Sequence, residues 1–281
     1  MSQQRTLLQR GLHHPSFILG GVLTLALIAC ALLSLVWTPW NPYEMNMDAK
    51  LLPASSQFWM GTDAFGRDVL SQIMVGARSS IAVGLIAVGI GLVFGVTLGL
   101  LAAALRGWVE EVIMRMSDFT FAFPAILSAI MMTAVFGPSM VNAIIAIGIF
   151  NIPTFARITR ASANAIWARE YILAARACGK NRLSITVQHV LPNIAGVLLV
   201  QATIQFALAI LAEAALSYLG LGTQPPQPSW GRMLSDAQTL MFQAPMLAVF
   251  PGVAIALSVL GLNLLGDGLR DVLDPRLHRT R

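Results

Sequence analysis

Long apolar stretches alternate with short charged segments along the chain. A helix needs about 20 mostly apolar residues to cross a bilayer, and four mostly apolar stretches of that length predict spans at about 17–37, 79–105, 194–218 and 245–265. The apolar stretch between Asp118 and Arg157 is too long for one crossing, and a turn is expected at Gly137-Pro138-Ser139. It predicts two further spans at about 119–137 and 140–156. The pattern is that of an all-α integral membrane protein with six transmembrane helices in one domain.

The composition supports this interpretation. Hydrophobic residues make up 56% of the 281 and charged residues 11%, whereas a soluble domain carries about 25% charged residues. A net charge of +5 would suggest nucleic acid as the partner of a soluble chain. Here the basic residues cluster in loops between spans, which indicates membrane topology instead. No nucleic-acid partner is therefore predicted.

The distribution of Lys and Arg predicts the orientation. If the amino terminus is cytoplasmic, fourteen of the 18 basic residues lie inside and four outside. Because cytoplasmic loops are enriched in Lys and Arg, both termini and the loop 157–193 are expected in the cytoplasm. The chain then divides into a cytoplasmic tail, a first span, an external segment, a core of five spans and a second cytoplasmic tail, at 1–16, 17–37, 38–78, 79–266 and 267–281.

The later part of the external segment predicts a helix that lies in the outer membrane interface. Thr62 and Asp63 suit a helix N-cap, and the apolar residues that follow recur at helical spacing with polar residues between them. This helix is expected to lead into the second span. In that span Gly91, Gly95 and Gly99 open one face to close packing by a neighbouring helix, with a moving hinge as the alternative.

Glu213 is the only acidic residue inside a predicted span. A charge at the centre of a membrane helix costs roughly 2.5 to 3.5 kcal/mol on insertion scales and is a functional candidate by default. Glu213 is therefore a candidate for the wall of an aqueous pathway. Because it lies only five residues before Tyr218, near the outer end of its span, a structural hydrogen bond is the alternative.

The outer loop 220–231 is stiffened by three prolines and contains Trp230, a residue type suited to the membrane surface. A rigid external loop of this kind could contact a soluble partner or close a pathway, which makes Trp230 a candidate for an outer gate. An ordered connector is the equal alternative.

The cytoplasmic loop 157–193 predicts two short amphipathic helices. The first ends at Gly179, a residue type that suits a helix stop. The second runs from about Arg182 to Val190 and is expected to end at Pro192. The centre of the loop, Ala174 and Ala175 followed by Gly179, carries small side chains that a partner could approach closely.

No catalytic or metal-binding constellation is recognisable. Gly179-Lys180 is followed by Asn181, and position 174 is Ala, so the loop lacks the Gly-rich phosphate cradle of a Walker A motif. The four His and two Cys residues show no metal-ligand spacing. The chain is therefore expected to be no enzyme, to have no catalytic or metal-ligating residues and to bind no cofactor.

After the first span, nearly the whole chain resembles a known family. The loop resembles the "EAA" loop of bacterial ABC-importer permeases at Ala174, Ala175, Gly179, Leu191 and Pro192, with Leu173 where Glu is usual and His189 where Ile is usual. Five more blocks are similar, in the same order, to the "C" permease subunit of dipeptide, oligopeptide and nickel importers. They are 61–68, Phe123-Pro124, 218–222, 228–231 and 263–276.

The resemblance implies a type I ABC-importer permease fold in the bacterial inner (plasma) membrane. The expected partners are a homologous second permease, a periplasmic substrate-binding protein and two cytoplasmic ATPases, which would hold the ATP and Mg²⁺. The loop would be a coupling helix received by the ATPases, with Glu170, Ala174, Ala175, Gly179, Leu191 and Pro192 as its coupling residues.

The substrate stays open between peptides and nickel. No histidine is expected on the outer side, which favours peptides. A secondary transporter is a remote alternative, because it would show charged or broken helices near the membrane midplane, where only Glu213 is a candidate.

Overall fold

The computed structural model describes residues 14–273 of the chain. Most of the two predicted tails, including Asp274-Pro275-Arg276 of the last family block, lies outside these residues. Between 14 and 273 the chain is helical and forms no strand. Five helices are long and apolar enough to cross a membrane, and a sixth candidate is a pair of shorter helices bent against each other. The all-α membrane fold predicted from the apolar pattern is thus confirmed, with one broken span.

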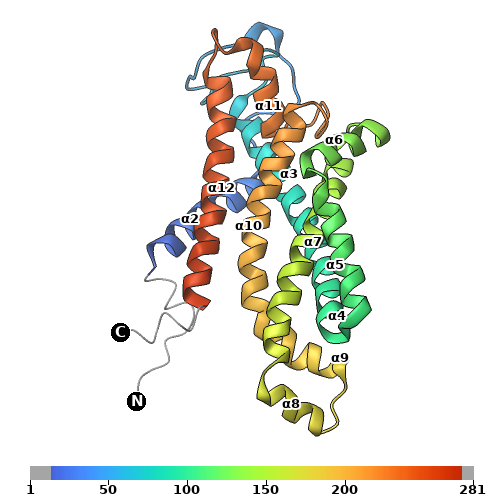
Figure 1. Cartoon of the computed structure of the whole chain (residues 1–281). Helices are drawn as coiled ribbons and strands as arrows, with labels where there is room; N and C mark the ends of the chain where they lie inside the picture. The colour runs from blue at the N-terminus through green and yellow to red at the C-terminus, as the bar shows by residue number, and fades with distance from the viewer. Residues whose placement is uncertain (1–13, 274–281) are drawn as a thin grey trace, which may run out of the picture.

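The helices form an elongated bundle (Figure 1). On one side α2 (Pro15–Val36) packs against α12 (Met246–Leu273). Their backbones meet closely, because a Cβ atom added to Gly20 would lie 2.2 Å from the Leu265 nitrogen. The last helix continues eight residues beyond the predicted end of the sixth span at 265, so residues 267–273 are part of a helix and not of a tail.

The second span is one unbroken helix from Val69 to Leu105, made of α3 (Val69–Ile90), the π-helical turn η2 (Gly91–Val96) and α4 (Thr97–Leu105). Close packing of its glycine face is confirmed: a Cβ atom on Gly95 would lie 2.5 Å from the Ile152 carbonyl oxygen. The partner is α7 (Met140–Trp167).

The expected interfacial helix starting at Thr62 and Asp63 is wrong. Asp68 is the N-cap, and its Oδ2 accepts a hydrogen bond from the Ser71 N–H at 2.8 Å. Asp63 instead stabilises the preceding turn, because its Oδ1 accepts hydrogen bonds from the backbone N–H groups of Phe65 and Arg67. Both acidic residues can cap a helix, but the positive φ of Gly66, +72°, turns the chain just before Asp68.

The predicted third span, 119–137, is also wrong in its bounds. Helix α5 (Gly107–Ala122) begins much earlier, and α6 (Ala125–Phe136) follows it at an angle of 81°. The break falls at Phe123-Pro124, because proline disfavours a helical conformation in the residue before it. The predicted turn at 137–139 is confirmed, since Ser139 caps α7 with its hydroxyl. Helix α7 then continues to Trp167, eleven residues beyond the predicted end.

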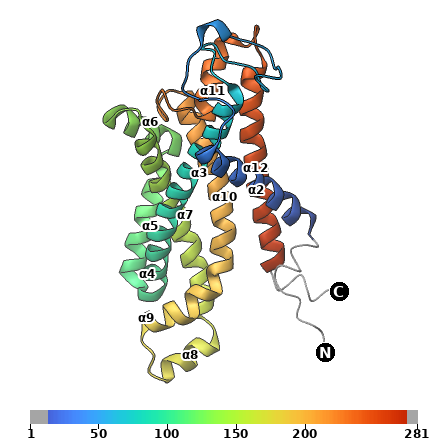
Figure 2. The same ribbon diagram turned by 180° about the vertical axis from the view of Figure 1, so that it is seen from behind.

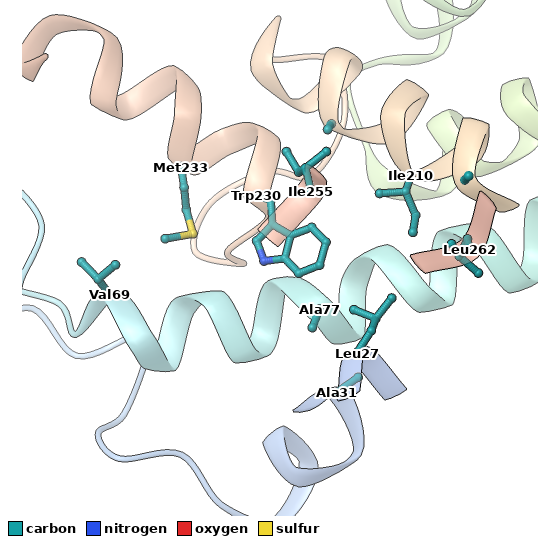
Figure 3. Close-up of a cluster of buried hydrophobic side chains, with 11 residues drawn as sticks. Leu27, Ala31, Val69, Ala77, Ile210, Trp230, Met233, Ile255 and Leu262 are labelled. Carbon is teal, nitrogen blue, oxygen red and sulfur yellow. The ribbon is translucent and has the colours of Figure 1, made fainter. Parts of the chain in front are cut away.

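The two ends of the bundle differ in construction (Figures 1 and 2). At one end, called the outer end here, the segment 37–68 and the short helix α11 (Trp230–Ala237) cover α3, α12 and α10 (Leu191–Tyr218). A buried hydrophobic cluster joins these elements (Figure 3), with Trp230 among Val69, Ala77, Ile210 and Ile255. At the other end, the inner end, α8 (Glu170–Ala177) and α9 (Arg182–Ile185) form a protruding hairpin.

Candidate functional site

The inner hairpin lies where the sequence predicts the coupling loop, but it is shorter. Residues 157–167 belong to α7, so the turn away from the bundle begins only at Ala168. Helix α8 ends as predicted at Gly179, whose φ is +82°. The Lys180 N–H donates to the Ala175 carbonyl at 3.1 Å across this turn. A left-handed residue after the helix and such a returning hydrogen bond form the usual glycine C-cap.

The prediction that Pro192 ends a helix is wrong. Residues Arg182–Tyr218 form one continuous helix of 37 residues, in which the π-helical turn η3 (Thr186–Val190) joins α9 to α10. Leu191 donates its N–H to the Thr186 carbonyl, five residues earlier. Proline has no N–H to donate, and Pro192 directly follows this π-helical turn, where the hydrogen-bond pattern of the helix already changes.

The base of the hairpin is fixed to the bundle. Ile172 and Ile185, one from each short helix, are fully buried in a cluster with Phe155 and Trp167. The Arg182 guanidinium donates to the Ala104 carbonyl at the end of α4, at 3.0 Å. The hairpin is therefore attached both to α7 and to the inner end of the second span.

The tip of the hairpin has the opposite character. Leu173 and Leu183 are 57% and 72% exposed, and Ala174 is exposed between them. A Cβ atom on Gly179 would meet nothing within 4 Å. Of the predicted coupling residues, Glu170 and Pro192 are also exposed, while Ala175 and Leu191 are half-buried. An apolar, uncovered surface on a fixed base is suited to docking by another protein.

A cavity of about 630 Å³ opens on the side of the bundle formed by α6, α7 and α10. Its wall is mostly apolar and aromatic, with Phe121, Phe123 and Phe150 among its residues. Three polar side chains, Asn151, Thr154 and Gln205, also line it. Sequence reasoning missed these residues, although the signal was present in two side-chain amides inside predicted spans.

Glu213 does not line this cavity. It is 1% exposed, and its Oε1 accepts hydrogen bonds from the hydroxyl groups of Ser217 at 2.7 Å and Thr223 at 3.3 Å. The Ser217 oxygen in turn accepts the backbone N–H of Thr223 at 3.0 Å. Of the two alternatives for Glu213, this geometry supports the structural role. Its hydrogen bonds attach the outer loop to the end of α10.

Trp230 is not at the membrane surface, which corrects the prediction. Its side chain is 1% exposed, and its Nε1 donates to the Ile73 carbonyl of α3 at 3.0 Å. A Cβ atom on Gly76 would lie 2.6 Å from the indole, so the glycine makes room for the ring. Trp230 thus joins α11 to α3, and nothing in this position lets it act as an exposed gate.

Two ion pairs connect α5 to α7 near the inner end. Arg160 Nε lies 2.5 Å from Glu110 Oε1, and Arg157 pairs with Asp118 while its guanidinium lies over the Phe121 ring. Phe121 also lines the cavity, so these pairs position its inner edge. Among residues 14–273, no group of three His, Cys, Asp or Glu side chains could hold a metal ion.

Comparison with known proteins gives one consistent result. Residues 95–279 match the family model described as "Binding-protein-dependent transport system inner membrane component". A dipeptide transport system permease protein, DppC, of Alkalihalophilus pseudofirmus is 44% identical over 92% of this chain and 86% of its own length. A glutathione transport system permease protein, GsiD, of Pectobacterium atrosepticum is 42% identical over 96% of this chain and 90% of its own.

The fold also resembles a solved structure. An inward-facing structure of the MetNI methionine ABC transporter superposes with a TM-score of 0.61, covering 72% of this chain and 97% of the matched chain, at 18% identity. At this identity the likeness concerns the fold alone. It agrees with the type I importer permease fold that the family blocks imply.

Proposed function

Because the chain belongs to the family of binding-protein-dependent transport system inner membrane components, we propose that it forms half of the pathway of an ATP-driven peptide importer. A homologous second permease would supply the other half. The 630 Å³ cavity beside α6, α7 and α10 is open on one side, as expected of a pathway completed by a partner.

The proposed substrates are short peptides. Relatives more than 40% identical over most of the chain are named for dipeptides, for di- and tripeptides and for glutathione. The cavity supports this choice, since the amides of Asn151 and Gln205 can donate to and accept from peptide backbones and its apolar wall can contact side chains. Nickel is not favoured, because imidazole is a typical ligand of nickel and no His, Cys or Met lines the cavity.

The inner hairpin is proposed to transmit the force of ATP hydrolysis, which would occur on two separate ATPase subunits that hold ATP and Mg²⁺. The observation that carries this proposal is the contrast between the exposed tip, with Leu173 and Leu183, and the fully buried base, with Ile172 and Ile185. A partner that holds the tip would move the base and the helices attached to it as one body.

We further propose that the hairpin lies in the cytoplasm, together with both termini. This agrees with the excess of Lys and Arg on that side. The opposite end, with segment 37–68 and α11, would face the periplasm and receive a substrate-binding protein. In this orientation the two histidines among residues 14–273, His14 and His189, would lie on the cytoplasmic side.

The coupling proposal can be tested with the assembled transporter in vesicles. Gly179→Trp places a bulky ring on the tip, but it also strains a backbone with φ of +82°. Ala174→Trp adds the same bulk at an exposed helical position and avoids that strain. Both variants are expected to insert normally but to lose substrate-stimulated ATP hydrolysis and peptide uptake.

Two controls separate bulk from strain and from a general effect of tryptophan. Gly179→Asn keeps a small residue that tolerates positive φ and is expected to retain most activity. Gly21→Trp adds a ring where a Cβ atom meets nothing within 4 Å, far from the hairpin. Normal uptake by Ala174→Trp would refute the coupling role of the tip.

A further inference from the structure

A second large cavity lies at the inner end, on a different face from the proposed pathway. Its volume is about 670 Å³, and it is lined by the end of α7, the inner half of α10 and the end of α12. None of its residues lines the first cavity. Its wall on α10 is formed by Asn193, Gly196, Val197, Val200, Gln201 and Ile204.

The cavity has a largely apolar wall along α10 and two basic residues among its lining. Val197, Val200 and Ile204 succeed one another on α10, and Leu273 of α12 stands opposite Gly196, 3.4 Å from where a Cβ atom would be. Two arginines from different helices also line the cavity, Arg169 after α7 and Arg270 in the last turns of α12. Both are exposed.

These two arginines differ from Arg157 and Arg160, which are paired with carboxylates of α5. Within residues 14–273, no ion pair shorter than 4.0 Å uses Arg169 or Arg270. The nearby carboxylates of α12, Asp267 and Asp271, are not among the residues that line the cavity. The cavity therefore presents two guanidinium groups that a ligand with negative charge could pair with.

The dimensions identify the kind of ligand. From Asn193 to Ile204 the wall follows twelve residues of α10, or about 16 Å from the first to the last at the α-helical rise. One leaflet of a bilayer has a hydrocarbon depth of about 15 Å, half of the usual core thickness. Arg169 directly precedes α8 of the hairpin, and Arg270 lies on α12 between Gly266, which faces Val200 and Thr203, and Leu273, which faces Gly196.

We propose that this cavity binds an anionic phospholipid, with an acyl chain along Val197, Val200 and Ile204 and the phosphate between Arg169 and Arg270. Guanidinium groups pair with phosphate in a bidentate manner, and basic pockets between membrane helices at the cytoplasmic side suit acidic headgroups. A free phosphate would leave the apolar wall uncovered, and a zwitterionic lipid would bring the cation of its own headgroup next to the two arginines. Binding of this lipid does not depend on the proposed peptide substrate.

Native mass spectrometry of the purified transporter complex tests the proposal directly. The complex in detergent is titrated with phosphatidylglycerol and with phosphatidylcholine of identical acyl chains, and bound lipid is counted for each. Wild type is expected to prefer phosphatidylglycerol. Arg169→Gln with Arg270→Gln is expected to weaken phosphatidylglycerol binding by roughly 30-fold, about fivefold per arginine on the scale of surface Lys and Arg at anionic membranes, and to weaken phosphatidylcholine binding less.

Two further variants make the result specific. Arg115→Gln removes another exposed arginine near the inner end, which lies outside this cavity, and is expected to bind as wild type. Gly196→Leu fills the apolar part of the cavity while leaving both arginines, and is expected to lose the phospholipid.

Several results would overturn the proposal. Equal binding of the two lipids by wild type would remove the role of charge, and an unchanged preference in the double arginine variant would place the lipid elsewhere. Competition by inorganic phosphate or glycerol phosphate at the same concentrations as the phospholipid would show a site for free anions. Peptide uptake is not part of this readout, so failure here and failure of the proposed function remain distinguishable.

Discussion

Removing the indole of Trp230 is expected to separate the outer end of α3 from α11. The ring is buried between these helices, with its Nε1 bonded to the Ile73 carbonyl at 3.0 Å and with Gly76 directly beneath it. It also packs in the cluster that includes Val69 and Ile255 (Figure 3). Truncation therefore removes the hydrogen bond and leaves a large hole in the outer half of the bundle.

The expected losses of stability differ enough between the variants to be ranked. Replacing a buried Trp with Ala costs about 3–5 kcal/mol. Trp230→Phe keeps most of the ring volume but loses one hydrogen bond, which contributes about 1 kcal/mol. Gly76→Ala places a Cβ atom 2.6 Å from the indole, and overpacking of this kind costs about 1–3 kcal/mol.

Thermal melting of the purified complex, followed by size-exclusion chromatography of the heated samples, can rank these variants. The expected order of melting temperature is wild type, Trp230→Phe, then Trp230→Ala. Trp59→Ala is the matched control, because Trp59 is 65% exposed, and Gly89→Ala is the control for Gly76→Ala, because a Cβ atom there meets nothing within 4 Å.

The double variant tests the contact itself. Since the steric conflict of Gly76→Ala is with the indole atoms, Trp230→Phe should reduce the cost of Gly76→Ala, and residues in contact show such coupling of about 0.5–3 kcal/mol. Additive effects of the two substitutions, or a Trp230→Ala variant with the melting temperature of wild type, would refute a buried contact between α11 and α3.

Three other predictions concern packing and charge. Gly95→Leu should prevent α7 from packing on the second span and abolish recovery of folded protein from the membrane, whereas Gly89→Leu should be recovered normally. Glu213→Ala should lower the melting temperature, because it leaves buried hydroxyl groups without an acceptor, at a cost of about 1–3 kcal/mol in stability. Glu213→Gln keeps an acceptor and should lower the melting temperature less. Burial raises the pKa of Asp236 despite the nearby Arg232, so the folded form holds its proton more tightly and stability is lost as pH rises through that pKa. The melting temperature of Asp236→Asn relative to wild type should then increase as pH rises. A difference between the two melting temperatures that does not change with pH would contradict this.

The apolar pattern predicted which segments cross the membrane, because a span must be continuously apolar and satisfy its backbone internally. It could not predict where the helices end. Residues 69–78 and 157–167 carry charge, yet they extend α3 and α7 beyond the apolar stretch. A helix that leaves the bilayer can continue in water or against other protein, and local polarity does not forbid it.

In the candidate site, too, some features could be predicted from the sequence and others could not. Gly179 was predicted to stop a helix, and it does, because positive φ at that position depends mainly on the residue itself. Pro192 and Trp230 were misjudged because their roles depend on surroundings. The π-helical turn before Pro192 shifts the hydrogen bonds it would interrupt, and Gly76, far away in sequence, makes the space that buries Trp230.

The continuous helix Arg182–Tyr218 relates the hairpin to the outer end. At 37 residues it is about 55 Å long, and it carries the buried Ile185 at its inner end and the Glu213 hydrogen bonds at its outer end. The second span, Val69–Leu105, has the same length, and it is held to the hairpin by Arg182 and to α11 by Trp230. A displacement of the hairpin tip is therefore expected to reach the outer loop through two long helices fixed to each other at both ends, and the π-helical turns η2 and η3 are the only breaks in α-helical geometry along them within the described residues.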